Sequence, residues 1–108
     1  MGSDKKRGKM DIYCDILRVC ESGSNKTRIM YKANLSYELL KRYMWELESS
    51  GLIIVSGKTV RLTEKGKRVL LLIARAKSIR KELEEVEHTI SEYVGKDVEK
   101  IKATSNYG

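Results

Sequence analysis

Apolar side chains recur at helical spacing in three short stretches of the first half of the chain, which predicts three amphipathic helices. The first covers residues 10–21, and the second covers residues 26–31, with Ser24 or Asn25 as its cap. The third begins after Ser36, another good capping residue. Its apolar face is formed by Leu40, Met44 and Leu47.

After Gly51 the pattern changes from helical to alternating. Residues 52–56 are apolar and β-branched, residues 59–62 alternate, and Gly57-Lys58 between them is a turn signal, so a two-stranded hairpin is expected. Three helices followed by a hairpin is the order of a winged helix-turn-helix, in which the third helix enters the major groove of DNA and the hairpin is the wing.

A long helical stretch follows the hairpin. Thr63 is a good N-cap, and residues 64–94 contain no Pro and no Gly after Gly66. Apolar residues follow alternating steps of three and four along it, a heptad seam that needs a second helix beside it. We therefore predict a dimer interface formed by Val69, Leu72, Ala76, Ile79, Leu83, Val86, Ile90 and Tyr93.

Charge predicts how the two helices pair. Residues 64–81 carry seven basic residues and one acid, whereas residues 82–94 carry five acids and no Lys or Arg. An antiparallel pair places the basic half of one helix beside the acidic half of the other. The alternative is that the helix folds back on its own domain.

The predicted fold is α+β and mainly α, a winged helix-turn-helix followed by a long C-terminal helix in an antiparallel two-stranded coiled coil. The expected parts are a disordered basic arm, a DNA-binding domain, a dimerisation helix and a short tail, at residues 1–9, 10–63, 64–94 and 95–108. A formal net charge of +7 and a pI near 9.5 favour a polyanionic partner, although a solvated basic surface would give the same composition.

Double-stranded DNA is the expected partner, and three groups of side chains are candidates to contact it. Residues at the start of the second helix would contact the sugar-phosphate backbone of the DNA, and residues early in the third helix would reach phosphates or base edges. The wing would lie beside the minor groove or the phosphates. The candidates are Lys26, Thr27, Arg28, Ser36, Tyr37, Lys41, Arg42, Lys58 and Arg61. The alternative for Tyr37 and Trp45 is packing against the first helix or against a dimer partner. Glu38, Glu46 and Glu48 should confine DNA contact to the beginning of the third helix.

Little in the sequence favours catalysis. A chain of 108 residues is short for a scaffold with a buried substrate pocket, His88 is the single histidine, and Cys14 and Cys20 have neither metal nor redox spacing. We expect no enzyme activity, metal, cofactor or small-molecule substrate. A cytoplasmic, nucleoid-associated protein is expected because the chain has neither a membrane span nor a signal peptide. The absence of Gln and the scarcity of Asn suggest a thermophilic source.

The run Glu21-Ser22-Gly23-Ser24-Asn25-Lys26-Thr27-Arg28-Ile29-Met30-Tyr31-Lys32-Ala33-Asn34-Leu35-Ser36-Tyr37 resembles the archaeal ten-a family of small basic DNA-binding proteins. The similarity covers residues 9–93. It implies dimeric winged helices joined by an antiparallel coiled coil, acting in archaeal chromatin or transcription regulation. The acidic end of the long helix and the tail after Gly95 depart from the family.

A second class of function is compatible with the same sequence. A winged helix can serve as a protein-interaction module in a transcription or repair complex, with Tyr37 and Trp45 as exposed anchors. Salt-dependent binding to unrelated duplexes would favour DNA binding, and indifference to DNA would favour the protein partner.

Overall fold

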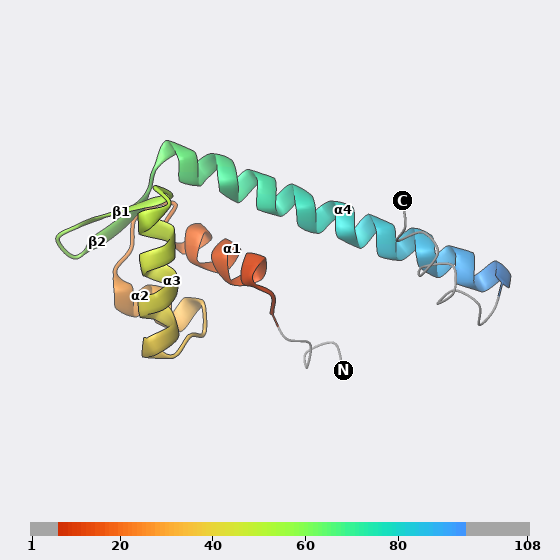
Figure 1. Cartoon of the computed structure of the whole chain (residues 1–108), viewed down its shortest axis with the longest axis horizontal. Helices are drawn as coiled ribbons and strands as arrows, with labels where there is room; N and C mark the ends of the chain where they lie inside the picture. The colour runs from red at the N-terminus through yellow and green to blue at the C-terminus, as the bar shows by residue number, and fades with distance from the viewer. Residues whose placement is uncertain (1–6, 95–108) are drawn as a thin grey trace. The chain divides into compact units, whose positions relative to one another are not determined.

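The computed structural model describes residues 7–94. Its elements are α1 (Lys9–Val19), α2 (Lys26–Lys32), α3 (Tyr37–Ser49), β1 (Ile53–Ser56), β2 (Thr59–Leu62) and α4 (Glu64–Val94) (Figure 1). The predicted order, a mainly helical chain with a two-stranded sheet and a long C-terminal helix, is confirmed. The chain divides into two compact units, one up to Ala74 and one from Arg75, and each is described by itself.

The first unit has an aliphatic core to which α1, α2, α3, both strands and the start of α4 contribute. The predicted inner face of α3 is confirmed, because Leu40, Met44 and Leu47 are 3%, 5% and 1% exposed. Tyr13 and Tyr43 meet edge to face with ring centroids 5.9 Å apart, which fixes α1 against α3. The largest fully buried aliphatic side chains are Ile16, Leu17, Ile29, Leu47 and Val60.

Both predicted caps are present. The Asn25 side chain accepts a hydrogen bond from the Arg28 N–H at 2.8 Å, and the Ser36 hydroxyl accepts one from the Leu39 N–H at 3.2 Å. Each cap satisfies one of the unpaired N–H groups in the first turn of its helix. The caps therefore set where α2 and α3 begin and which residues occupy their first turns.

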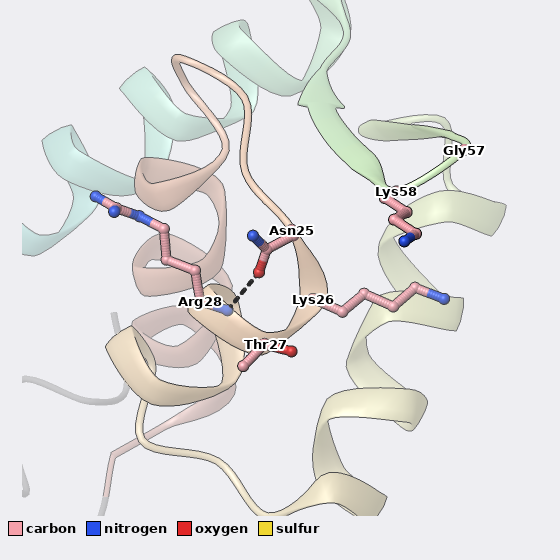
Figure 2. Close-up of a pocket in the computed structure, with 6 residues that line it drawn as sticks. All are labelled: Asn25, Lys26, Thr27, Arg28, Gly57 and Lys58. Atoms are coloured by element: carbon pink, nitrogen blue, oxygen red, sulfur yellow. Dashed lines mark hydrogen bonds between the residues drawn. The ribbon is translucent and has the colours of Figure 1, made fainter.

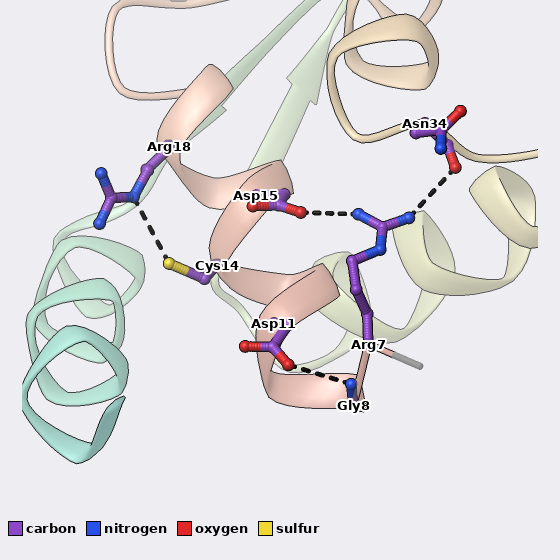
Figure 3. Close-up of polar contacts among 7 residues, drawn as sticks. All are labelled: Arg7, Gly8, Asp11, Cys14, Asp15, Arg18 and Asn34. Atoms are coloured by element: carbon purple, nitrogen blue, oxygen red, sulfur yellow. Dashed lines mark hydrogen bonds and ion pairs between the residues drawn. The ribbon is translucent and has the colours of Figure 1, made fainter. Parts of the chain in front are cut away.

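The N-terminal end of the described chain differs from the prediction. Lys9, assigned to the disordered arm, is the first residue of α1, and the helix ends at Val19 rather than at residue 21. The Gly8 N–H donates to Asp11 Oδ2, and Arg7 Nη1 lies 2.7 Å from Asp15 Oδ2 (Figure 3). Through these contacts with the first turns of α1, Arg7 and Gly8 belong to the folded unit. The rest of the predicted arm lies outside the described residues.

The turn between α2 and α3 contains Asn34 at a φ of +55°, in the left-handed region that Asn tolerates better than most residues. The Leu35 N–H donates to the Met30 carbonyl and the Asn34 N–H to the Tyr31 carbonyl, the Schellman pattern that ends a helix. Arg7 also donates to the Asn34 carbonyl at 3.1 Å (Figure 3). The turn therefore fixes the entry into α3.

The hairpin is antiparallel, with Ile53 opposite Leu62 and Val55 opposite Val60. The loop before α2 is attached to it, because Ser24 and Val60 exchange backbone hydrogen bonds. This bridge joins parts of the chain that are far apart in the sequence, so the local pattern of residues did not predict it. It places the start of α2 beside β2.

Thr63 joins the hairpin to α4. Its hydroxyl accepts a hydrogen bond from the Gly66 N–H at 2.9 Å, as predicted for an N-cap, and donates to the Gly51 carbonyl at 2.6 Å. A Cβ at Gly66 would collide with the Leu52 carbonyl oxygen. Glycine at position 66 therefore allows the first turn of α4 to pack directly on the backbone that enters β1.

The second unit, from Arg75 to the end of the described chain, consists of the remaining part of α4. Most of its large apolar side chains are exposed: Ile79, Leu83 and Val86 are each more than half exposed, and Tyr93 is 85% exposed. The predicted helix is confirmed as far as Val94. The predicted tail, residues 95–108, lies outside the described residues.

Candidate nucleic-acid interface

The start of α2 and the tip of the hairpin line an open cleft of about 710 Å³, here called the wing cleft (Figure 2). Figure 2 shows the Lys26 and Lys58 side chains reaching into the same region from α2 and the hairpin, while Arg28 points to the other side of α2. The lining contains three basic side chains and no carboxylate. Its residues are Asn25, Lys26, Thr27, Arg28, Gly57 and Lys58.

A second cleft, of about 530 Å³, continues the same basic surface along β2. It shares Arg28 and Lys58 with the wing cleft and adds Arg61 together with the hydroxyls of Ser22, Ser24 and Thr59. No carboxylate lines it either. Three cations at this surface attract a polyanion, and hydroxyls and backbone N–H groups supply the hydrogen bonds that phosphate oxygens accept.

Gly23 makes room for Arg61. It has a φ of +87°, and a Cβ there would lie 3.3 Å from Arg61 Nη1. Glycine adopts this backbone conformation without steric cost and leaves the guanidinium free to lie over the loop. The relation of Gly23 to Arg61 could not be inferred from the sequence without the bridge between Ser24 and Val60.

The exposed side of α3 carries aromatic and basic side chains together. Lys41 and Arg42 are exposed, and Lys41 Nζ lies 5.4 Å from the centre of the Tyr37 ring. One cleft of about 400 Å³ is lined by Glu38, Lys41, Arg42 and Trp45. Another, of about 310 Å³, includes Tyr37, Lys41 and Trp45 and connects to the wing cleft through Lys26.

Tyr37 and Trp45 do not pack into the core of the first unit. They are 65% and 70% exposed, so the alternative in which they pack on the first helix is wrong. Packing against a second copy of the chain stays a prediction.

Glu46 is not a free acid on the surface of α3. Tyr13 donates a 2.6 Å hydrogen bond to it, and Lys9 Nζ lies 3.5 Å from its other oxygen. The hydrogen bond from Tyr13 holds the pKa of Glu46 below its usual value. Burial of the Tyr13 hydroxyl, together with its hydrogen bond to the Glu46 carboxylate, raises the pKa of Tyr13 to about 12. Glu46 therefore opposes phosphate less than predicted, whereas Glu38 and Glu48 are exposed.

The structure leaves all the predicted DNA-contacting residues exposed and brings most of them together in four connected clefts. The Ser36 hydroxyl caps α3, as predicted, and its contact with DNA stays a prediction. Asn25, Gly23 and Trp45 were not among the predicted contacts but lie in the same clefts. The side chains that share clefts are Lys26, Thr27, Arg28, Tyr37, Lys41, Arg42, Lys58 and Arg61.

The predicted dimer residues, here called the α4 seam, differ in exposure. Leu72, Ile79, Leu83 and Val86 are 52–58% exposed, and Ala76 and Ile90 are half-buried. Val69 packs partly against the core of its own domain. The seam is therefore mostly uncovered in a single chain, and exposed Leu71 and Val94 lie outside it.

Cys14 and Cys20 are free, buried thiols of the core. Arg18 Nε donates to Cys14 Sγ at 3.5 Å (Figure 3), and burial raises the pKa of Cys20 to about 11. Within residues 7–94, no group of three or more His, Cys, Asp or Glu side chains is arranged to hold a metal ion. None of the described helices is long and apolar enough to cross a membrane.

The chain belongs to the winged helix-turn-helix family, whose pattern it matches over residues 6–81. Among solved structures it is similar to Sso10a-2, a DNA-binding protein from Sulfolobus solfataricus, with 33% identity and a TM-score of 0.76 over 84% of this chain and all of that one. An uncharacterized protein of Methanocaldococcus jannaschii is 37% identical over 65 residues, which are 59% of this chain and 67% of the relative.

Two bacterial structures share the fold at lower identity. ZitR of Lactococcus lactis is 19% identical, with a TM-score of 0.56 over 96% of this chain and 75% of that one. A MarR family transcriptional regulator of Silicibacter pomeroyi is 15% identical, with a TM-score of 0.54 over 92% and 72%. The predicted winged helix-turn-helix is thereby confirmed.

Proposed function

We propose that this protein binds double-stranded DNA through the surface formed by α2, α3 and the hairpin. The observation that carries the proposal is the wing cleft, where the Lys26 and Lys58 side chains reach into the same region and no carboxylate lines the cleft (Figure 2). Each cation that meets a phosphate releases condensed counterions, the main sequence-independent source of affinity for DNA. The similarity to Sso10a-2, a DNA-binding protein, supports the proposal.

The elements have different roles on the duplex. Residues at the start of α2, together with Lys58 and Arg61, contact the sugar-phosphate backbone and fix the orientation of the domain. The beginning of α3 enters the major groove, where Arg42 forms paired hydrogen bonds with a guanine edge or, like Lys41, binds phosphate. Exposed Glu38 and Glu48 repel phosphate from parts of the same helix.

The binding unit is a homodimer joined through α4 in an antiparallel coiled coil. Side chains such as Ile79, Leu83 and Val86 are over half exposed on a part of α4 that is otherwise mainly polar and charged. Burying apolar surface stabilises a complex by about 25 cal/mol per Å², which favours a second helix against this stripe. In domain terms, residues 10–63 bind DNA and residues 64–94 form the dimer.

We assign the protein to the archaeal ten-a family, as a nucleoid-associated protein of chromatin architecture or a transcription regulator without enzyme activity. The similarity to Sso10a-2 along its whole length supports the assignment. Footprinting on genomic DNA separates the two roles. A regulator protects its operator roughly a thousandfold better than bulk DNA, whereas an architectural protein protects many sites about equally.

A protein-interaction module is the second candidate. The exposed rings of Tyr37 and Trp45 favour it, because aromatic side chains are the commonest anchors of protein interfaces. In that case the basic clefts would not govern binding, and removing Trp45 would matter more than removing Lys58.

The test is a titration of the full chain with two labelled duplexes of unrelated sequence at increasing salt concentration. DNA binding predicts that both bind and that the logarithm of the association constant falls linearly with the logarithm of the salt concentration. Tyr37→Ala plus Trp45→Ala should reduce this binding less than loss of the wing-cleft cations. Failure of both duplexes to bind at low salt would refute the proposal.

A further inference from the structure

The spacing of the α4 seam is the same when read from either end. From Val69 to Tyr93 the steps between successive seam residues are three, four, three, four, three, four and three. An antiparallel partner presents these steps in reverse order, so seam residues meet at every layer only if both series coincide. The symmetry of the series about position 81 allows all eight residues to meet at once.

We propose that two copies of α4 pair around a two-fold axis beside Lys81, an inference that rests on the homodimer proposed above. Ile79 then packs on the partner's Leu83, and Ala76 packs on the partner's Val86. Leu72 meets the partner's Ile90, and Val69 meets the partner's Tyr93. The outermost pair contributes least, because Val69 packs partly against the core of its own domain.

Neighbouring registers fit the sequence less well. If the axis lay between positions 84 and 85, neither Leu72 nor Val69 would meet a seam residue of the partner within Glu64–Val94. If it lay between positions 77 and 78, Ile90 would face the partner's Lys65. Each shift leaves at least one seam residue without an apolar partner, so less apolar surface is buried than with the axis at position 81.

The distribution of charge selects the same axis independently. Position 81 is where the basic half of α4 ends and the acidic half begins. With the axis there, residues 82–94 lie beside residues 68–80 of the other copy, which carry four basic residues and no acid. An axis nearer the C-terminus would set Glu82, Glu84, Glu85 and Glu87 of the two copies against each other. A parallel pair would place the basic halves of the two helices side by side, and likewise the acidic halves.

Disulfide cross-linking of the full chain tests this register. A disulfide requires two Cα atoms within about 7 Å, so only residues in one layer can be joined. Leu72→Cys plus Ile90→Cys marks the proposed axis, whereas Ile79→Cys plus Ile90→Cys and Leu72→Cys plus Leu83→Cys mark the two shifted axes. Within one chain these pairs are 11 or 18 residues apart, about 16 Å or more along a helix, so they cannot close internally.

Mild oxidation followed by electrophoresis without reductant gives the result, and Ile90→Cys alone reports a parallel pair. The unsubstituted chain is the control, because Cys14 and Cys20 are buried. The proposal predicts that the first double variant becomes mainly a covalent dimer while the others stay at the level of the control. Sedimentation of each variant under reducing conditions shows whether the dimer itself exists.

The outcomes separate the register from the proposed function. A dimer that cross-links through residues 79 and 90, through residues 72 and 83, or through residue 90 alone overturns the axis at Lys81. A chain that sediments as a monomer and forms no covalent dimer overturns both the register and the homodimer.

Discussion

The Tyr13 hydroxyl donates a 2.6 Å hydrogen bond to Glu46 Oε1, joining α1 to α3. The same two helices are joined by the edge-to-face contact of Tyr13 with Tyr43. The bond explains why a tyrosine occupies this half-buried position of α1, since its ring packs in the core and its hydroxyl needs an acceptor. It also explains why Glu46 turns away from the open side of α3.

Tyr13 predicts a loss of stability at high pH. Its pKa is about 12 in the folded chain against 10 for an ordinary tyrosine, so folding favours the protonated hydroxyl. The corresponding stabilisation is complete below pH 10 and is lost as the pH rises from 10 to 12. Denaturant unfolding between pH 9 and 12 measures this, and Tyr13→Phe should be less stable at pH 9 but fall less steeply above pH 10. Equal slopes for the two proteins would contradict the role of this hydroxyl.

Gly66→Ala should destabilise the first unit. The new Cβ would collide with the Leu52 carbonyl, and because that atom belongs to the backbone, relief requires the start of α4 to move. Overpacking of this kind costs about 1–3 kcal/mol in the free energy of unfolding. Gly57→Ala is a useful comparison: it has open space but a φ of +60°, so it should lose about 1 kcal/mol from backbone strain alone. A Gly66 variant as stable as the wild type would show that the contact with Leu52 is not close.

Lys41→Ala plus Arg42→Ala should weaken DNA binding and flatten its salt dependence. If both side chains meet phosphates, the slope of log K against log salt falls by about two. If Arg42 contacts a base, the slope falls by about one and discrimination between sequences declines. Fluorescence anisotropy over a salt series measures both. If the slope and the affinity are unchanged, Lys41 and Arg42 of α3 do not contact DNA.

Ile79→Asp plus Leu83→Asp should abolish the dimer and leave the first unit folded. Both residues lie in the second unit and are over half exposed in a single chain, so charge there disturbs only a partner. Analytical ultracentrifugation reports the loss of the dimer, and circular dichroism reports the fold. Ser78→Asp is the matched control on the same helix, outside the seam. A persistent dimer would count against α4 as the interface.

The sequence predicted those parts of the fold that depend on local spacing. The inner face of α3, the caps at Asn25 and Ser36, and the hairpin follow from residues close together in the chain. Long-range contacts were not predictable in this way. The bridge between Ser24 and Val60 places α2 beside the hairpin. Without that bridge, neither the common cleft of Lys26 and Lys58 nor the space that Gly23 leaves for Arg61 can be inferred.

The candidate site was predicted mainly because its side chains are basic and belong to elements of known order. Side chains with more than one possible partner were harder to place. Helical spacing predicts that Glu46 is a surface acid, but Tyr13 and Lys9 bind it. The alternatives for Trp45 were packing against the first helix or against a second copy of the chain, and in the single chain it lies 70% exposed beside Lys41 and Arg42.

The salt dependence of DNA binding after removal of the wing-cleft lysines tests the central claim most directly. Lys26→Ala plus Lys58→Ala should reduce the slope of log K against log salt by about two and weaken all duplexes alike. Lys32→Ala, which removes one positive charge at the other end of α2, should leave the slope nearly unchanged. A double variant that binds DNA with the affinity and slope of the wild type would contradict the account.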